Sequence, residues 1–261
     1  MTVNGGGSRR AGGWHPPGNP RTWIIGIVAF AAVVIALETR RINRFEIIYF
    51  CVLVPSIIIH EISHGAVALA FGDDTAKRLG RLNLNPVRHV DPVGTLLVPA
   101  VLSLSGLGAY GWAKPVPVNP SRLRSPRNHT VLVSLVGPTT NFVLAALLGV
   151  VYVFVVPPDI RSQLGQLAAQ GLVAYPPSFF GQVVFIAALA NIVLGVFNLI
   201  PCPPLDGAAV LERFIPARSL GEYYRLQPAL MFLPFILILL FRNQWSELIN
   251  QVMAWFAQIV A

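Results

Sequence analysis

Charged residues are scarce in this sequence, and their scarcity excludes an ordinary soluble protein. Only 11% of the 261 residues are Asp, Glu, Lys or Arg, whereas 54% are hydrophobic. A soluble domain averages about 25% charged residues. Residues 92–113, 128–158 and 162–205 contain no charged residue, and about 20 apolar residues suffice for one helical crossing of a bilayer. The sequence therefore predicts an integral membrane protein.

Cysteine is nearly absent as well, and the basic residues are not gathered on one face. Cys51 and Cys202 lie in apolar segments without a CxxC pair, so they indicate no disulfide framework. The net charge of +8 comes from Lys and Arg in short loops, which orient membrane spans and contact anionic headgroups. We therefore expect the lipid bilayer as a partner and no nucleic acid. The oligomeric state is not indicated.

The apolar runs predict an all-α polytopic fold with about five transmembrane helices. We expect a disordered tail over 1–20, a membrane domain over 21–241 and an amphipathic C-terminal helix over 242–261. The predicted spans cover 22–37, 45–71, 129–156, 181–200 and 228–241.

One further apolar segment, 93–112, differs from these spans because Pro99 and four glycines interrupt it. We expect it to form a re-entrant or β-hairpin segment. The prolines and alternating valines of Lys-Pro-Val-Pro-Val-Asn-Pro (114–120) favour an extended strand after it.

The motif His60-Glu61-Ile62-Ser63-His64 lies in the second half of the predicted span 45–71. In a helix the two histidines stand at i and i+4, so both imidazoles project from one face and can share a zinc ion. Glu61 lies beside them as a general base. Ionisable groups inside an apolar span are costly and indicate a functional site. The alternative is a pair of helix-packing histidines with a glutamate that reaches the membrane surface.

A catalytic zinc site usually has three protein ligands, and Asp206 is the candidate for the third. It follows Pro201, Pro203 and Pro204, which interrupt the helix in Asn198-Leu-Ile-Pro-Cys-Pro-Pro-Leu-Asp-Gly207. An ordinary turn at the end of a helix would also explain an Asp-Gly pair. Cys202 is a second, weaker candidate as a soft metal ligand.

Three motifs in this order, HEISH (60–64), GPTTN (137–141) and NLIPCPPLDG (198–207), resemble the site-2 protease family of intramembrane zinc metalloproteases. The resemblance covers roughly residues 45–240. It implies one Zn²⁺ per chain bound by His60, His64 and Asp206, with Glu61 as general base. It also implies a transmembrane protein as the substrate.

The same resemblance brings two asparagines near the site. Asn141 and Asn198 match asparagines of the family, and we expect contacts with the substrate or the oxyanion. We recognise no PDZ-like or CBS-like module in the sequence, so the chain is similar to the family's minimal subgroup.

The basic residues favour the re-entrant arrangement of 93–112. With re-entry, 14 of the 19 Lys and Arg lie on one side of the membrane, whereas a six-span arrangement divides them 9 to 10. Re-entry also brings Asp206 to the side of His60 and His64. Because positive charge concentrates on the cytoplasmic side, we expect a cytoplasmic N-terminus in a protein of the cell membrane.

The sequence leaves two other functional classes open. A zinc-binding membrane transporter or scaffold would hold the metal without protease activity, but it would not need Glu61. A transporter should also contain paired broken helices in two repeated halves, and the sequence contains no such repeat. If the chain were a receptor or structural anchor, its four aligned ionisable groups at membrane depth would have no function.

Overall fold

The computed structural model describes residues 44–91, 94, 114–172, 174–230 and 233–261, and these residues are helical with irregular connections and no strands. The predicted tail 1–20, the predicted span 22–37 and most of 93–112 lie outside the described residues. The short helices comprise α3 (Thr75–Arg78), η1 (Pro86–Arg88), η3 (Pro120–Arg122) and η4 (Ala217–Ser219).

Three long apolar helices form the centre of the described structure. They are α2 (Arg44–Ala70), α5 (Pro126–Val155) and α7 (Phe179–Asn198), and each is long and apolar enough to cross a membrane. A helix of 20 residues spans about 30 Å, the thickness of the hydrocarbon core. All three pack against one another. Three of the predicted spans are thus confirmed as helices, with ends within three residues of the predicted ones.

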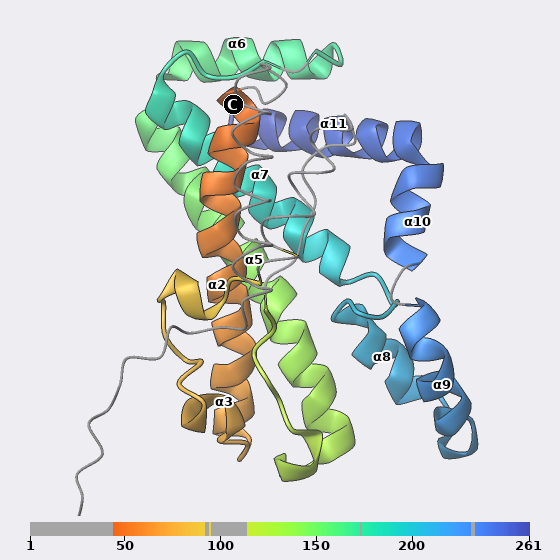
Figure 1. The fold of residues 1–261 in the computed structure, drawn as a ribbon. Coiled ribbons are helices and arrows are strands. Elements are labelled where there is room, and N and C mark those ends of the chain that lie inside the picture. The colour runs from red at the N-terminus through yellow and green to blue at the C-terminus, as the bar shows by residue number, and fades with distance from the viewer. Residues whose placement is uncertain (1–43, 92–93, 95–113, 173, 231–232) are drawn as a thin grey trace, which may run out of the picture.

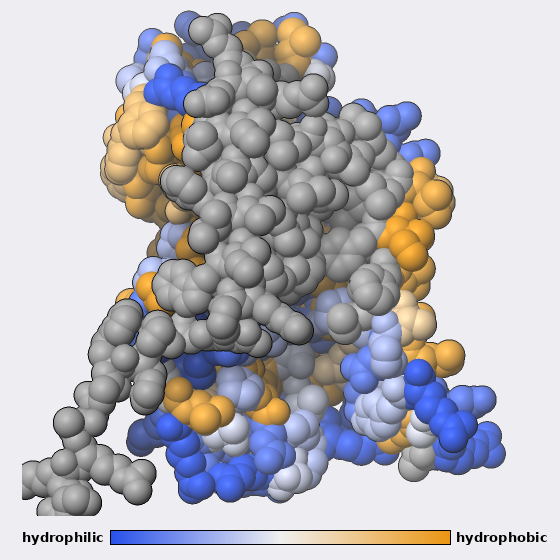
Figure 2. Space-filling model, viewed as in Figure 1, coloured by the Kyte–Doolittle hydropathy of each residue, from blue (hydrophilic) through white to orange (hydrophobic). Residues whose placement is uncertain are grey.

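Most of the remaining helices lie at the two ends of this group (Figure 1). α3, α8 (Gly207–Phe214) and α9 (Leu220–Leu230) lie at one end, and α6 (Pro158–Ala169) and α11 (Arg242–Ile259) lie at the other, with α10 (Leu233–Leu240) on the flank between them. Hydrophilic residues gather over α3, α8 and α9, and hydrophobic residues cover the flank at α10 (Figure 2). This distribution suits a protein that crosses a bilayer with the α3–α9 end in water.

The largest buried hydrophobic cluster lies near the opposite end. Tyr152 of α5, Phe185 of α7 and Phe256 of α11 pack together, with ring centroids 5.5–6.3 Å apart. Arg161 of α6 donates to the carbonyl of Val260 at 2.9 Å and so ties α6 to the end of α11. The C-terminal helix is therefore packed into the protein along one side.

The last apolar run, 228–241, is described only in part. The structure describes the end of α9 and the helix α10 within it, and residues 231–232 between them lie outside the described residues. The span predicted over 228–241 therefore stays a prediction.

The segment 114–119 does not form the predicted strand. Pro115 and Pro117 have no N–H group, and two of the amides left are bonded to carboxylates of the α2 region. Val116 N donates to Glu61 Oε2 at 2.7 Å, and Asn119 N donates to Asp73 Oδ2 at 2.6 Å. The backbone is therefore held by side chains, and no β-ladder forms among the described residues.

The end of α2 and the beginning of α5 lie at the same end of the molecule. Lys114 N donates to the carbonyl of His89 at 2.9 Å, and Arg124 N donates to the carbonyl of Phe71 at 3.0 Å. These bonds join the two flanks of 92–113. Consequently α2 and α5 run antiparallel, with the His60–His64 half of α2 beside the first half of α5.

Candidate metal centre

Two histidines of α2 face the centre of the three-helix group. His60 and His64 are one turn apart, so their rings project from the same face of the helix. Their Nε2 atoms lie 3.0 Å apart, and the rings meet edge to face with centroids 4.7 Å apart. Both side chains are buried, with relative exposures of 4% and 7%.

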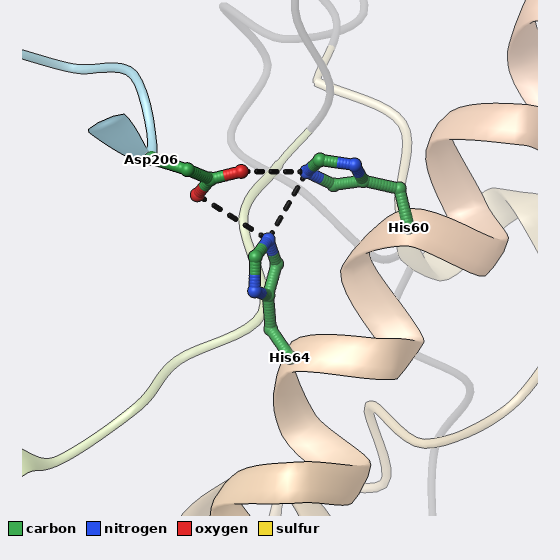
Figure 3. Close-up of side chains that lie close together, drawn as sticks. All are labelled: His60, His64 and Asp206. Atoms are coloured by element: carbon green, nitrogen blue, oxygen red, sulfur yellow. Dashed lines mark hydrogen bonds and ion pairs between the residues drawn. The ribbon is translucent and has the colours of Figure 1, made fainter. Parts of the chain in front are cut away.

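Asp206 reaches this pair from the connection between α7 and α8 (Figure 3). Its Oδ2 lies 3.1 Å from His60 Nε2, and its Oδ1 lies 3.3 Å from His64 Nε2. Asp206 occupies the N-cap position of α8, yet its side chain makes no capping hydrogen bond. The carboxylate points to the histidines, so a simple helix-capping role does not explain it.

Gly207 allows the chain to turn so tightly at Asp206. A Cβ atom at position 207 would come within 2.5 Å of the carbonyl oxygen of Ile200. Only glycine therefore lets the start of α8 rest on the end of α7. This packing places the carboxylate of the preceding residue beside His60 and His64.

The partners of the Nδ1 atoms determine which imidazole nitrogens are protonated. His64 Nδ1 lies 2.6 Å from the carbonyl oxygen of Val133 on α5. A carbonyl only accepts, so Nδ1 carries the proton and Nε2 presents a lone pair. His60 Nδ1 lies 2.5 Å from Asn141 Oδ1, which leaves its Nε2 equally free of a proton.

The three side chains therefore direct only electron pairs at one another. Asp206 Oδ2 is buried and accepts no hydrogen bond, although His60 Nε2 lies 3.1 Å away. Such a group is repulsive unless a cation lies between its members. In tetrahedral zinc sites with Zn–N distances of about 2.0–2.1 Å, ligand atoms lie about 3.3 Å apart. The separations of 3.0–3.3 Å and the His₂Asp donor set fit a zinc ion.

Gly137 of α5 packs directly against the two imidazoles. A Cβ atom at this position would stand 2.5 Å from His64 Cε1 and 2.6 Å from His60 Cε1. Glycine is thus required for α5 to approach the imidazoles so closely. This glycine begins the GPTTN motif, which also supplies Asn141.

Glu61 lies on α2 beside the two histidines and is partly exposed. Its Oε2 accepts the 2.7 Å hydrogen bond from Val116 N, so the irregular segment 114–119 fixes the carboxylate. Asn198 is placed differently, because its Nδ2 donates to the carbonyl of Leu194 on its own helix at 2.9 Å. Cys202 Sγ lies 3.5 Å from the carbonyl of Pro203 and outside the His60–His64–Asp206 cluster.

Several residues that shape the site were not predicted from the sequence. Asn191 of α7 accepts a 2.8 Å hydrogen bond from Asn141 Nδ2 and is 1% exposed. A buried polar residue in a charge-free span is a signal that could have indicated it. Val133 and Val116 act through backbone groups, and no residue type signals such a contact.

Comparison with known proteins gives a consistent result. The family model described as Peptidase family M50 matches residues 48–241. “Putative zinc metalloprotease YwhC” of Bacillus subtilis (strain 168) is 40% identical over 164 residues, covering 63% of this chain and 67% of that protein. “Putative zinc metalloprotease Rip2” of Mycobacterium tuberculosis (strain ATCC 25618 / H37Rv) is 34% identical over 189 residues, covering 71% and 63%.

A second Rip2, from Mycolicibacterium smegmatis (strain ATCC 700084 / mc(2)155), is 31% identical over 182 residues, covering 68% of this chain. The chain spans 62–63% of the Rip2 proteins it matches. No solved structure matches it. The family model extends over most of the chain and includes the HExxH motif and Asp206. The chain therefore belongs to peptidase family M50, the site-2 proteases, which are zinc metalloproteases.

Proposed function

We propose that this chain is an intramembrane endopeptidase that hydrolyses peptide bonds of membrane-spanning proteins. The observation that carries the proposal is the position of Glu61 next to three converging metal-ligand atoms. His60 and His64 stand in the interior of α2, a helix that is long and apolar enough to span the bilayer. A reaction at this site therefore takes place at membrane depth, where peptide bonds of a spanning substrate are found.

His60, His64 and Asp206 would hold one Zn²⁺ per chain. When bound, zinc lowers the pKa of a water ligand to about 7 and polarises a carbonyl oxygen. Glu61 removes a proton from the attacking water and later delivers it to the leaving amine. The Val116 amide keeps the Glu61 carboxylate in one orientation during both transfers.

The segment 114–119 is our candidate for the substrate-binding edge. A helical substrate hides its carbonyls in its own hydrogen bonds, so it must unwind before hydrolysis. An unwound peptide would pair with the backbone of Val118 by edge addition, because the amides of Val116 and Asn119 are bonded to carboxylates and the prolines have no N–H. The bond between Val116 and Glu61 would then place the bound peptide beside the general base.

We further infer five spans, with 93–112 re-entering and the N-terminus in the cytoplasm. The distribution of charge supports this orientation. Most Lys and Arg of the described residues lie at the α3–α9 end, whereas Arg44, Arg161 and Arg242 belong to the other end. The hydrogen bond that joins Lys114 to His89 supports re-entry, because both flanks of 92–113 meet at one end.

A zinc-binding transporter or scaffold is the main alternative, and Glu61 distinguishes the two classes. In a closed metal site a second carboxylate that is not a ligand has no function. The test is therefore Glu61→Gln, with zinc content and peptide cleavage measured on matched preparations. Cleavage is expected to depend on Glu61, whereas zinc content is not.

A further inference from the structure

A chain of buried amides leads away from His60 on the side opposite the metal-ligand atoms. Asn141 Oδ1 contacts His60 Nδ1 at 2.5 Å, and Asn141 Nδ2 donates to Asn191 Oδ1 at 2.8 Å. Asn191 Nδ2 donates in turn to the carbonyl of Ala187 and to the hydroxyl of Ser56, each at 2.9 Å. Asn141 and Asn191 are 0% and 1% exposed, so water does not compete for these bonds.

The Ala187 end of this series of amides determines the direction of every hydrogen bond in it. The carbonyl of Ala187 can only accept, so the Asn191 atom beside it must be the amide nitrogen. Asn191 therefore turns its oxygen to Asn141, and Asn141 must offer its own nitrogen there. The oxygen of Asn141 is left for His60, whose Nδ1 must carry the proton.

We propose that Asn191 is a positioning residue that, through Asn141, holds His60 in the tautomer able to bind a metal ion. The inference rests on the proposed zinc site. A neutral imidazole protonated at Nε2 has no lone pair at that atom. Without Asn191, the Asn141 amide can rotate by half a turn and present its nitrogen to His60 Nδ1, which stabilises the wrong tautomer. Partners of this kind typically change metal affinity about 10–100-fold.

His64 provides an internal control, because its tautomer does not depend on the amide chain. Its Nδ1 contacts the carbonyl of Val133 directly at 2.6 Å. A backbone carbonyl cannot exchange donor and acceptor atoms by rotation. A change at position 191 should therefore affect His60 and leave His64 as it is, whereas a general loosening of the helices would affect both.

The experiment compares the full-length wild-type chain with three variants in detergent. Asn191→Leu removes the amide that anchors this hydrogen-bonded chain. Asn191→Asp, as the neutral acid that burial favours, keeps an oxygen that accepts from Asn141 and an O–H that donates to the carbonyl of Ala187. Thr130→Val is the matched control, because Thr130 also donates to the carbonyl four residues earlier but takes no part in the amide chain. Zinc affinity is measured by competition with a chromophoric chelator. The histidine tautomers are read from ¹⁵N NMR spectra of the zinc-free proteins.

We expect Asn191→Leu to bind zinc about 10–100-fold more weakly, with His60 but not His64 shifted towards the Nε2–H tautomer. Asn191→Asp and Thr130→Val should bind zinc close to the wild-type affinity. Wild-type affinity in Asn191→Leu, or an equal loss in Asn191→Asp, would overturn the inference. If Asn191→Leu does not fold, the wild-type spectrum decides, because a His60 Nδ1 without a proton contradicts the proposal, whereas a proton on Nε2 beside a protonated Nδ1 only neutralises the zinc-free cluster. A wild-type chain that binds no zinc would instead refute the proposed function, and the tautomer spectra would still test Asn191.

Discussion

Gly137 shows how one missing side chain shapes the metal centre. A methyl group at this position would stand 2.5–2.6 Å from carbon atoms of both imidazoles. We expect Gly137→Ala to lower zinc occupancy sharply, because the histidines must move apart and leave their shared geometry. Metal analysis of the purified variant measures this.

The control is Gly149→Ala on the same helix, where the new Cβ would meet Phe256 at an ordinary 3.5 Å. Alanine favours a helix over glycine by roughly 0.5–1 kcal/mol, so a loss of helix does not explain a deficit at position 137. Full zinc occupancy in Gly137→Ala would show that the imidazoles are not held against α5 as described.

The residues of the site differ in how far their place could be predicted. His60, Glu61 and His64 are indicated because helical spacing brings i and i+4 together. Asp206 is indicated because a carboxylate at membrane depth is costly and therefore points to a function. Asn191 lies 50 residues from its partner Asn141 in the chain, and only the packing of α5 on α7 reveals the pair. The contacts of Val133 and Val116 use backbone atoms that every residue possesses.

At the scale of elements, Asp73 is the second carboxylate, after Glu61, that binds the backbone of the segment 114–119. Asp73 is buried and accepts hydrogen bonds from Thr75 N at 3.0 Å, from the Thr75 hydroxyl and from Asn119 N at 2.6 Å. Burial by itself would raise the pKa of this carboxyl, but the hydrogen bonds from Thr75 and Asn119 and the charge of Arg122 outweigh it. The pKa is therefore lowered.

We expect Asp73→Asn to destabilise the fold by about 1–3 kcal/mol at neutral pH, because buried donors lose their acceptor. A lowered pKa stabilises the folded chain above the unfolded value of about 3.9, and this contribution is lost as the pH falls through the folded value. The difference between wild type and Asp73→Asn should thus shrink below about pH 4. Thermal unfolding in detergent across this pH range measures it. Asp74→Asn is the control, since its ion pairs with Arg78 and Arg122 are exposed, and an equal effect of both variants would contradict the account.

The elements could be predicted where the length of an apolar run determines the structure, and less well where prolines determine it. The helices α2, α5 and α7 follow from long apolar runs. The run 228–241 is equally apolar, but residues 231–232 lie outside the described part of the chain, so the span predicted there stays a prediction. At 114–119 the valine alternation favours a strand, whereas the prolines remove the donors that a strand would need. Carboxylates from the α2 region then bind the remaining amides.

At the scale of the whole molecule, the proposed orientation places the N-terminus and the α3–α9 end in the cytoplasm. Single cysteines at Asn4, Ser121 and Ser162, in a Cys51→Ser, Cys202→Ser background, test it with a membrane-impermeant thiol reagent on intact cells. Ser121 and Ser162 are exposed. Ser121 lies in η3, between the end of α2 and the beginning of α5, and Ser162 lies on α6 at the opposite end (Figure 1). We expect only Ser162→Cys to react, because 14 of 19 basic residues hold the other end inside. Reaction of Ser121→Cys without Asn4→Cys would show that 93–112 crosses the membrane.

The central claim is that a carboxylate beside a buried His₂Asp centre performs proteolysis in the membrane. Glu61→Gln tests it most directly, because the amide keeps the size of the side chain but cannot take a proton. Zinc content is measured on the purified proteins, and membrane-protein fragments are compared between cells that express the wild-type chain or the variant. We predict equal zinc content, with chain-dependent fragments reduced at least about 100-fold in the variant. Equal zinc content with the same fragments at wild-type levels would contradict the account.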